Sequence, residues 1–147
     1  MGICRKDNQL LSELFNRKNN PIPLNVNYKS FDNWTPIHFA ALHGNLYALG
    51  LLLEHPEIYV NSLTNFRWSA LHIAVKNNKV EVVRRLLGAA IEGNYQDEDG
   101  NTALHYAVEL GYKELVRVLL QEASHSKISI ELRNNQGLLA QDLTLDH

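Results

Sequence analysis

Hydrophobic residues recur at helical spacing along the chain, in short runs separated by polar segments that contain Asn, Asp and Gly. Three of these runs match almost column by column: TPIHFAALHGNLYALGLLL from Thr35, SALHIAVKNNKVEVVRRLL from Ser69 and TALHYAVELGYKELVRVLL from Thr102. The histidines of the three copies are 34 and 33 residues apart, at His38, His72 and His105. Internal repetition with a period of ~20 to 50 residues is typical of solenoids and similar arrays.

Each copy predicts a pair of short helices. Hydroxyl residues of the N-cap type begin the first helix, at Thr35, Ser69 and Thr102. Residues that tolerate the left-handed backbone end it, at Gly44, Asn78 and Gly111. A helix of about two turns is not stable alone. Each pair must therefore bury its apolar face against its neighbours, which predicts an all-α solenoid.

The motif Thr-Pro-Ile-His-x-Ala-Ala from Thr35, followed by Gly44, a Leu-Leu pair and Val60-Asn61, resembles the ankyrin repeat. The resemblance covers about residues 5 to 147 and occurs three times in register. It implies one domain over residues 1–147, an all-α ankyrin-repeat solenoid of stacked helix-turn-helix units with hairpin-like loops. In that family the repeated histidine is structural and ties the helix start to neighbouring turns.

The resemblance also divides the chain. We expect a degenerate N-terminal capping repeat, three full repeats and a partial fourth, at residues 5–29, 30–63, 64–96, 97–133 and 134–147. The capping helix would carry Leu10, Leu11, Leu14 and Phe15 on its inner face. Because a repeat array normally ends in a full capping unit, we expect the natural protein to continue past His147. The alternative is a short chain that ends in half a cap.

Composition narrows the function classes. The net charge of -2 argues against general nucleic-acid binding, which needs a basic face. No apolar run approaches the roughly 20 residues that span a bilayer. Cys4 is the single cysteine, so no intrachain disulfide is possible and a reducing compartment is favoured. Gly2 does not match the N-myristoylation pattern, because Lys6 stands where Ser or Thr is expected.

The sequence predicts neither catalysis nor a cofactor or metal. The three column histidines lie a repeat apart and would not converge on one ion. Cys4 has no nearby His or Asp that would activate it. The acidic run at 97–99 lacks the further oxygen ligands that calcium needs. Asp97 instead fits the family's turn-supporting aspartate, and the two acidic residues after it are interpreted as a solvated turn.

The resemblance implies where a partner would bind. In this fold the variable surface comprises the hairpin tips and the exposed side of each first helix, which together form a concave groove. The tips correspond to Phe31, Asp32 and Trp34, to Asn65, Phe66, Arg67 and Trp68, and to Glu98, Asp99 and Asn101. The helix positions correspond to Leu42, His43, Lys76, Asn77, Glu109 and Leu110. Leu42 and Leu110 would be apolar groups that face the groove rather than the core.

The three hairpin tips differ in the chemical character of their side chains. Aromatic residues and Arg dominate interface hot spots, and the first two tips are aromatic while the third is acidic. The pattern predicts a protein or peptide ligand with an apolar anchor near repeats 1 and 2 and basic character near repeat 3. Trp34 and Trp68 fit packing and binding equally well. Arg67 stands where the repeat usually has a turn glycine, so it indicates either another turn type or a residue kept for contact.

Two function classes follow. The first is a non-catalytic interaction module that acts alone, as a monomer, in the cytoplasm or nucleus. The second is the N-terminal targeting or recruiting domain of a longer enzyme, or of a secreted pathogen effector that acts in host cytoplasm on a host protein. A minor alternative concerns Asn61, which resembles ankyrin asparagines that an oxygenase hydroxylates; the other interpretation is an Asn that bonds the loop backbone.

Overall fold

The computed structural model describes residues 25–126 and 128–144. Its α-helices are α2 (Pro36–His43), α3 (Leu46–Glu54), α4 (Ala70–Lys76), α5 (Val80–Gly88), α6 (Ala103–Glu109) and α7 (Lys113–Ser126). Two 3-10 helices flank them, η1 (Phe31–Asn33) and η2 (Ala140–Leu143). Over the described residues the chain has no β-strand. The all-α fold class predicted from the repeat is therefore confirmed.

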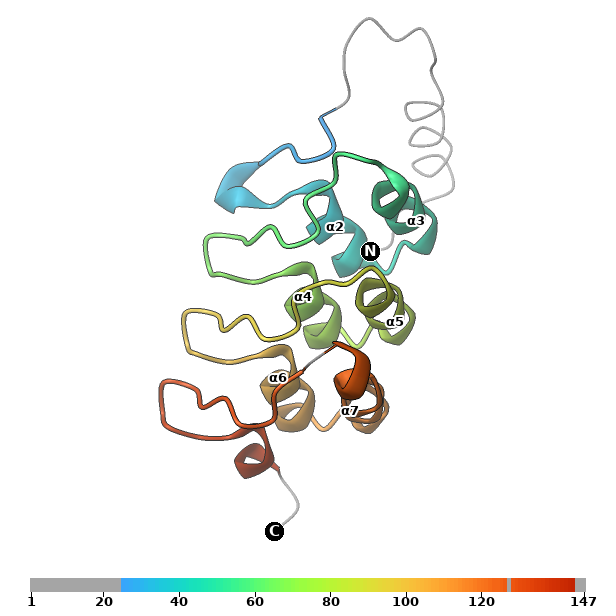
Figure 1. Cartoon of the computed structure of the whole chain (residues 1–147). Coiled ribbons are helices and arrows are strands. Elements are labelled where there is room, and N and C mark those ends of the chain that lie inside the picture. Colours follow the sequence, from blue (N-terminus) through green and yellow to red (C-terminus); the bar gives the residue numbers. More distant parts are fainter. Residues whose placement is uncertain (1–24, 127, 145–147) are drawn as a thin grey trace, which may run out of the picture.

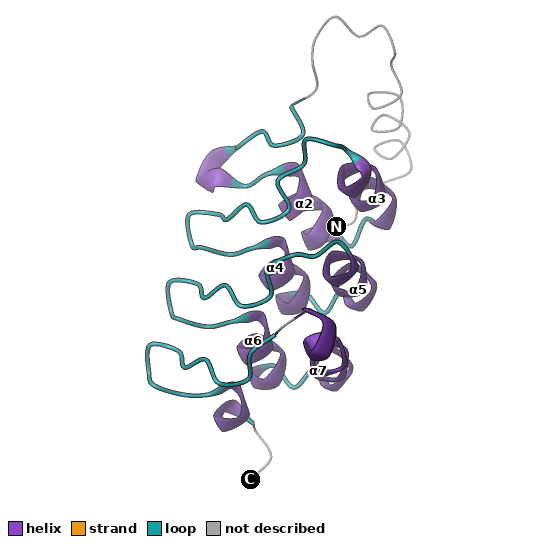
Figure 2. Ribbon diagram, viewed as in Figure 1, coloured by secondary structure: helices purple, strands orange, loops and turns teal. Residues whose placement is uncertain are grey.

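The helices form two parallel columns, one of first helices and one of second helices (Figures 1 and 2). In the first column α2 packs on α4, α4 on α6, and α6 on η2; in the second, α3 packs on α5 and α5 on α7. The long loops between repeats project from the same side of the first column as a row of hairpins (Figure 2). This is the solenoid arrangement, in which each repeat contacts only its neighbours.

The predicted helix ends are present. The side chains of Ser69 and Thr102 accept hydrogen bonds from the backbone N–H groups of His72 and His105 at the starts of α4 and α6. The left-handed residues that follow the first helices have positive φ, with 67° at Gly44, 55° at Asn78 and 73° at Gly111. Each first helix therefore turns sharply into the second.

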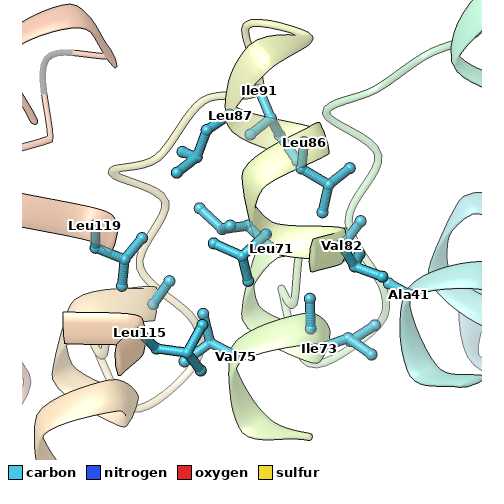
Figure 3. Close-up of a cluster of buried hydrophobic side chains, with 14 of the residues drawn as sticks. Ala41, Leu71, Ile73, Val75, Val82, Leu86, Leu87, Ile91, Leu115 and Leu119 are labelled. Carbon is cyan, nitrogen blue, oxygen red and sulfur yellow. The ribbon is translucent and has the colours of Figure 1, made fainter. Parts of the chain in front are cut away.

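The core lies between the two helix columns. Leu71, Ile73 and Val75 of α4 are fully buried, and Leu86 of α5 and Leu115 of α7 pack into the same cluster (Figure 3). Each such aliphatic side chain contributes ~1.5 to 3 kcal/mol by leaving water. Because helices of seven to nine residues are marginal alone, this packing between repeats is what holds them.

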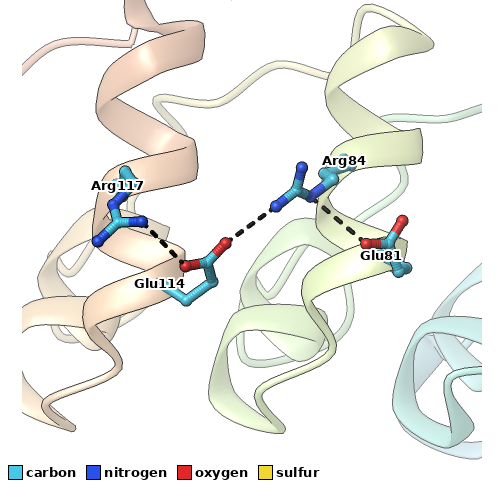
Figure 4. Close-up of polar contacts among 4 residues, drawn as sticks. All are labelled: Glu81, Arg84, Glu114 and Arg117. Atoms are coloured by element: carbon cyan, nitrogen blue, oxygen red, sulfur yellow. Dashed lines mark hydrogen bonds and ion pairs between the residues drawn. The ribbon is translucent and has the colours of Figure 1, made fainter.

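The outer surface of the second column carries a chain of ion pairs. Arg84 bridges Glu81 at 3.5 Å and Glu114 at 3.0 Å, and Glu114 also pairs with Arg117 at 3.6 Å (Figure 4). All four side chains are about half exposed or more, so each pair is worth at most about 1 kcal/mol. The chain joins α5 to α7 without dominating their association.

The repeated histidine connects the start of each first helix to the loop segment that follows its helix pair. The Nδ1 atom of His38 accepts the Thr35 backbone N–H at 2.9 Å, and Nε2 donates to the Ser62 carbonyl at 2.9 Å. His72 and His105 repeat the arrangement, with Nε2 to the carbonyls of Asn101 at 3.0 Å and Leu138 at 2.9 Å. Both ring nitrogens are used by the neutral imidazole, so these histidines are structural, as the resemblance implied.

A second set of contacts between repeats comes from asparagines in the inter-repeat loops. The side-chain oxygen of Asn27 accepts the Tyr59 N–H at 2.8 Å, Asn61 accepts the Glu92 N–H at 2.8 Å, and Asn94 accepts the Ser129 N–H at 2.7 Å. The interpretation of Asn61 as a residue that bonds loop backbone is therefore confirmed. Its hydroxylation remains a prediction.

Four hairpin loops have a fourth residue with positive φ. These values are 61° at Asn33, 63° at Arg67, 78° at Gly100 and 78° at Gly137. Arg67 therefore occupies the left-handed position that usually takes glycine, and the alternative of another turn type is wrong. A side chain with a Cβ is strained there by ~1 kcal/mol or more, less for Asn.

Both ends of the repeat array extend beyond the residues that the structure describes. The predicted capping helix, with Leu10, Leu11, Leu14 and Phe15, lies outside the described residues. The fourth copy begins as η2, where Asp142 takes the histidine column and accepts the Leu139 N–H at 2.8 Å. The repeat boundaries themselves stay a prediction.

The histidine contacts predict that the protein loses stability in mild acid. Burial lowers the pKa of His38 from 6.5 to about 4, and burial also lowers the pKa of His72. Between pH 6.5 and about 4 the unfolded chain therefore binds a proton at His38 that the folded chain does not. The free energy of unfolding should fall with decreasing pH across this window, by up to ~1.4 kcal/mol per pH unit for each such histidine. Urea unfolding midpoints at pH 7 and pH 5 measure it. A His38→Gln variant with the same pH dependence as the natural chain would contradict this cause.

The turn geometry predicts that Arg67→Gly raises stability. The substitution relieves the strain at φ 63° and removes only an exposed 3.4 Å hydrogen bond from Nε to the Gln96 carbonyl. We expect a gain of ~0.5 to 1 kcal/mol, after the entropy that glycine adds to the unfolded chain. Thermal melts measure it. Gly100→Ala, at the same place in the next hairpin, is the control and should destabilise, because its Cβ would lie 2.6 Å from the Asn135 backbone nitrogen. A lower melting temperature for Arg67→Gly would contradict the strain.

Candidate functional site

The four hairpins are rigid in their backbones. Each is closed by a hydrogen bond from its first to its fifth residue: Ser30 to Trp34 at 2.8 Å, Thr64 to Trp68 at 3.0 Å, Asp97 to Asn101 at 3.0 Å and Asn134 to Leu138 at 2.9 Å. Adjacent hairpins are also bonded to one another, from Asn65 N to Asp32 O at 2.9 Å, Glu98 N to Phe66 O at 3.2 Å and Asn135 N to Asp99 O at 2.9 Å. Side chains at the tips therefore project from a continuous, fixed row.

The first hairpin presents an aromatic surface. Phe31 is 89% exposed, the largest exposed fraction among the large hydrophobic side chains of the described residues. Trp34 is partly buried against the core. The centroid of its ring lies 5.2 Å from the ring centroid of Phe39 and 5.9 Å from that of His38. Phe39, which was not among the predicted site residues, is exposed and extends this surface onto α2.

The second hairpin presents a second aromatic pair. Phe66 is 45% exposed, and its ring lies 5.0 Å from that of Trp68 in a tilted stack. Trp68 is partly buried against the core and donates its indole N–H to Asp97 at 3.1 Å. Trp68 therefore packs as scaffold along the hairpin row and supports the exposed ring of Phe66.

Asp97 organises the junction between repeats 2 and 3. Its buried carboxylate accepts the backbone N–H groups of Asp99 and Asn101, each at 3.0 Å, as the turn-supporting role requires. Its second oxygen accepts the Trp68 indole N–H and the Tyr106 hydroxyl. Burial and this bond raise the pKa of Tyr106 to about 12, so the phenol stays a donor. The turn role was expected, whereas the links to Trp68 and Tyr106 were not.

Lys76, a predicted site residue at the end of α4, lies against aromatic rings. Its ammonium nitrogen is 3.7 Å from the centroid of the Trp68 ring and 4.8 Å from that of Tyr106. Burial lowers the pKa of Lys76, and the nearby carboxylates of Asp97, Asp99 and Glu109 oppose that shift. The ammonium is therefore partly desolvated and surrounded by negative charge.

The remaining predicted helix positions differ in exposure. Leu110 is 44% exposed, as expected for an apolar group on the surface. Leu42 is partly buried and packs against the core, and its contribution to the groove stays a prediction. Asn77 donates its side-chain amide to the Ile73 carbonyl at 2.8 Å and thus closes its own helix. His43 is half-buried and Glu109 is exposed.

Among residues 25–126 and 128–144, no group of three or more His, Cys, Asp or Glu side chains could hold a metal ion. No helix in that part of the chain is long and apolar enough to cross a bilayer.

Comparison with known proteins agrees with the repeat geometry. A family model described as "Ankyrin repeats (3 copies)" matches residues 1–97 and 51–134. The human B-cell lymphoma 3 protein is 34% identical over 112 residues, which is 74% of this chain and 25% of the relative, and the mouse homologue is 31% identical over the same length. Alpha-latrotoxin-Lg1a of Latrodectus geometricus is 40% identical over 92 residues, or 61% of this chain and 7% of the toxin. The chain thus spans about a quarter of the B-cell lymphoma 3 proteins. The stacked helix pairs and the histidine contacts agree with this family model. The chain therefore belongs to the ankyrin-repeat family.

Proposed function

We propose that this chain is a non-catalytic module that binds a protein or peptide through its hairpin tips and the adjoining face of the first helices. Ankyrin repeats are generally protein–protein interaction modules. The observation that carries the proposal is the exposed ring of Phe31, with Phe66 on the next hairpin, on a backbone row fixed by hydrogen bonds. A large apolar ring held in water without a folding role is what an interface hot spot requires.

The partner we infer carries an apolar anchor for the first two hairpins and a basic group for the third. Phe31 and Phe66 supply the apolar contact area. Glu98, Asp99 and Glu109 are exposed, and their carboxylates form no ion pair with another described residue. Opposite charges at this end would orient the partner along the row and speed its association.

A second candidate is recruitment within a longer protein. The B-cell lymphoma 3 relatives are about four times longer than the part that this chain matches. In a longer parent, whether an enzyme or a secreted effector, the same surface would select a substrate or a location. We place the binding module in the cytoplasm or nucleus, or in the host cytoplasm for an effector, and expect a monomer. The full reading frame separates the two candidates.

Truncation of the exposed rings should weaken partner capture without unfolding the protein. Phe31→Ala and Phe66→Ala each remove a side chain with few core contacts, so the melting temperature should change little. Each should lower affinity ~30-fold if it is a hot spot worth about 2 kcal/mol. Affinity capture from a lysate of the source cell, followed by titration of the captured partner, measures the effect.

Tyr47→Ala is the matched control for that experiment. Tyr47 is an aromatic residue 47% exposed on α3, in the second helix column and away from the hairpins. Its removal should leave affinity unchanged. Equal losses for Tyr47→Ala and Phe66→Ala, or parallel losses of folding and binding, would contradict the proposed surface.

A further inference from the structure

The junction between repeats 2 and 3 holds an ammonium group against two aromatic rings. The rings of Trp68 and Tyr106 belong to different repeats, and the nitrogen of Lys76 lies 3.7 and 4.8 Å from their centroids. The attraction of a cation for an aromatic face is the interaction by which proteins recognise alkylated ammonium ligands. The junction therefore has the components of a cation site, and the chain's own lysine occupies it.

The ankyrin scaffold does not require this combination of side chains. At the junction between repeats 1 and 2 the matching columns hold Trp34, Leu42 and Ile73, so an aliphatic pair replaces the lysine and the tyrosine. Leu42 packs against the core and Ile73 is fully buried there. Because aliphatic residues satisfy the same packing one repeat away, the charged and aromatic set at the second junction needs a different explanation.

The site also carries more negative charge than its resident cation neutralises. The carboxylates of Asp97, Asp99 and Glu109 all act on the Lys76 ammonium and raise its pKa against the effect of burial. Three carboxylates thus face one ammonium. Asp99 and Glu109 are exposed, so they remain accessible to a second cation that approaches from solvent.

The resident lysine is held by the rings and the surrounding charge alone. Lys76 is the last residue of α4, its side chain is only partly buried, and no hydrogen bond or ion pair joins its ammonium to another described residue. The rings are fixed, in contrast, because Asp97 accepts from both the Trp68 indole and the Tyr106 hydroxyl. Departure of Lys76 would leave a preformed aromatic site, which costs little to organise on binding.

We propose that Trp68 and Tyr106, with the carboxylates around them, form a binding site for an alkylammonium group of the partner, and that Lys76 occupies this site until that group displaces it. The inference rests on the proposed protein-binding function and specifies the basic group expected near repeat 3. A lysine side chain, with or without N-methylation, has the required chemistry. Lys76 then acts as an internal competitor that keeps weak cations out.

Titration with tetramethylammonium chloride tests the site without any partner. The full chain is labelled with ¹⁵N, and the Trp68 indole N–H signal reports binding because that group belongs to the ring that holds the cation and is fixed by its hydrogen bond to Asp97. We expect Lys76→Ala to bind the probe at least tenfold more tightly than the natural chain. Lys76→Gln, which shortens and neutralises the side chain, should fall between them. Sodium chloride at equal concentration controls for ionic strength.

Two further variants assign the gain to the rings. In Lys76→Ala, a second substitution of Tyr106→Leu should abolish the gain, whereas a Trp34→Phe substitution at the first junction should leave it unchanged. The proposal is overturned if neither Lys76 variant gains affinity, if sodium chloride shifts the signal equally, or if the gain survives Tyr106→Leu in a chain that still folds. The probe titration tests the cation site, and partner capture with Phe66→Ala tests the binding function. A negative result in one experiment therefore does not decide the other.

Discussion

The neutral histidine at the start of each first helix is the interaction on which the array depends. It accepts the backbone N–H of its own helix cap and, in the second and third copies, donates to a carbonyl of the next repeat, as His72 does between Ser69 and Asn101. Helices of seven or eight residues are too short to persist alone. The imidazole therefore performs two tasks at once: it satisfies an orphan group at a helix terminus and fixes the distance to the neighbouring unit.

The hairpin row follows from the same connection. Because the carbonyls that accept from His72 and His105 belong to the residues that end the third and fourth hairpins, helix position and hairpin position are tied together. The bonds between hairpins then leave the tip side chains little freedom to move relative to one another. The aromatic residues at the first two tips and the acidic residues at the third thus keep a set spacing, which is what a surface for one extended partner needs.

The sequence predicted the features that repeat and missed those that occur once. Helix caps, left-handed turns and the column histidines recur in every copy, so their spacing identified them. The structural role of the histidines was implied by the resemblance to the ankyrin repeat. The column of Arg67 left the type of its turn open, and the structure shows that the residue is left-handed, with φ 63°. The contacts of Asp97 with Trp68 and Tyr106, and of Lys76 with both rings, depend on side chains of different repeats and on their rotamers. A column also does not give the extent to which neighbouring residues bury a side chain, and Leu42 packs partly against the core.

The greater length of α7 has a consequence for how such arrays change. With 14 residues, α7 exceeds the nine of α3 and of α5. The hairpins on either side of it are nevertheless bonded at 2.9 Å, from Asn135 to Asp99, the same distance as between the first two hairpins, from Asn65 to Asp32. Extra residues in a second helix therefore leave the hydrogen bonds between adjacent hairpins in place. The backbone hydrogen bonds between hairpins set the positions of the tips. A repeat can therefore acquire a longer second helix without a change in the binding surface that the hairpins form.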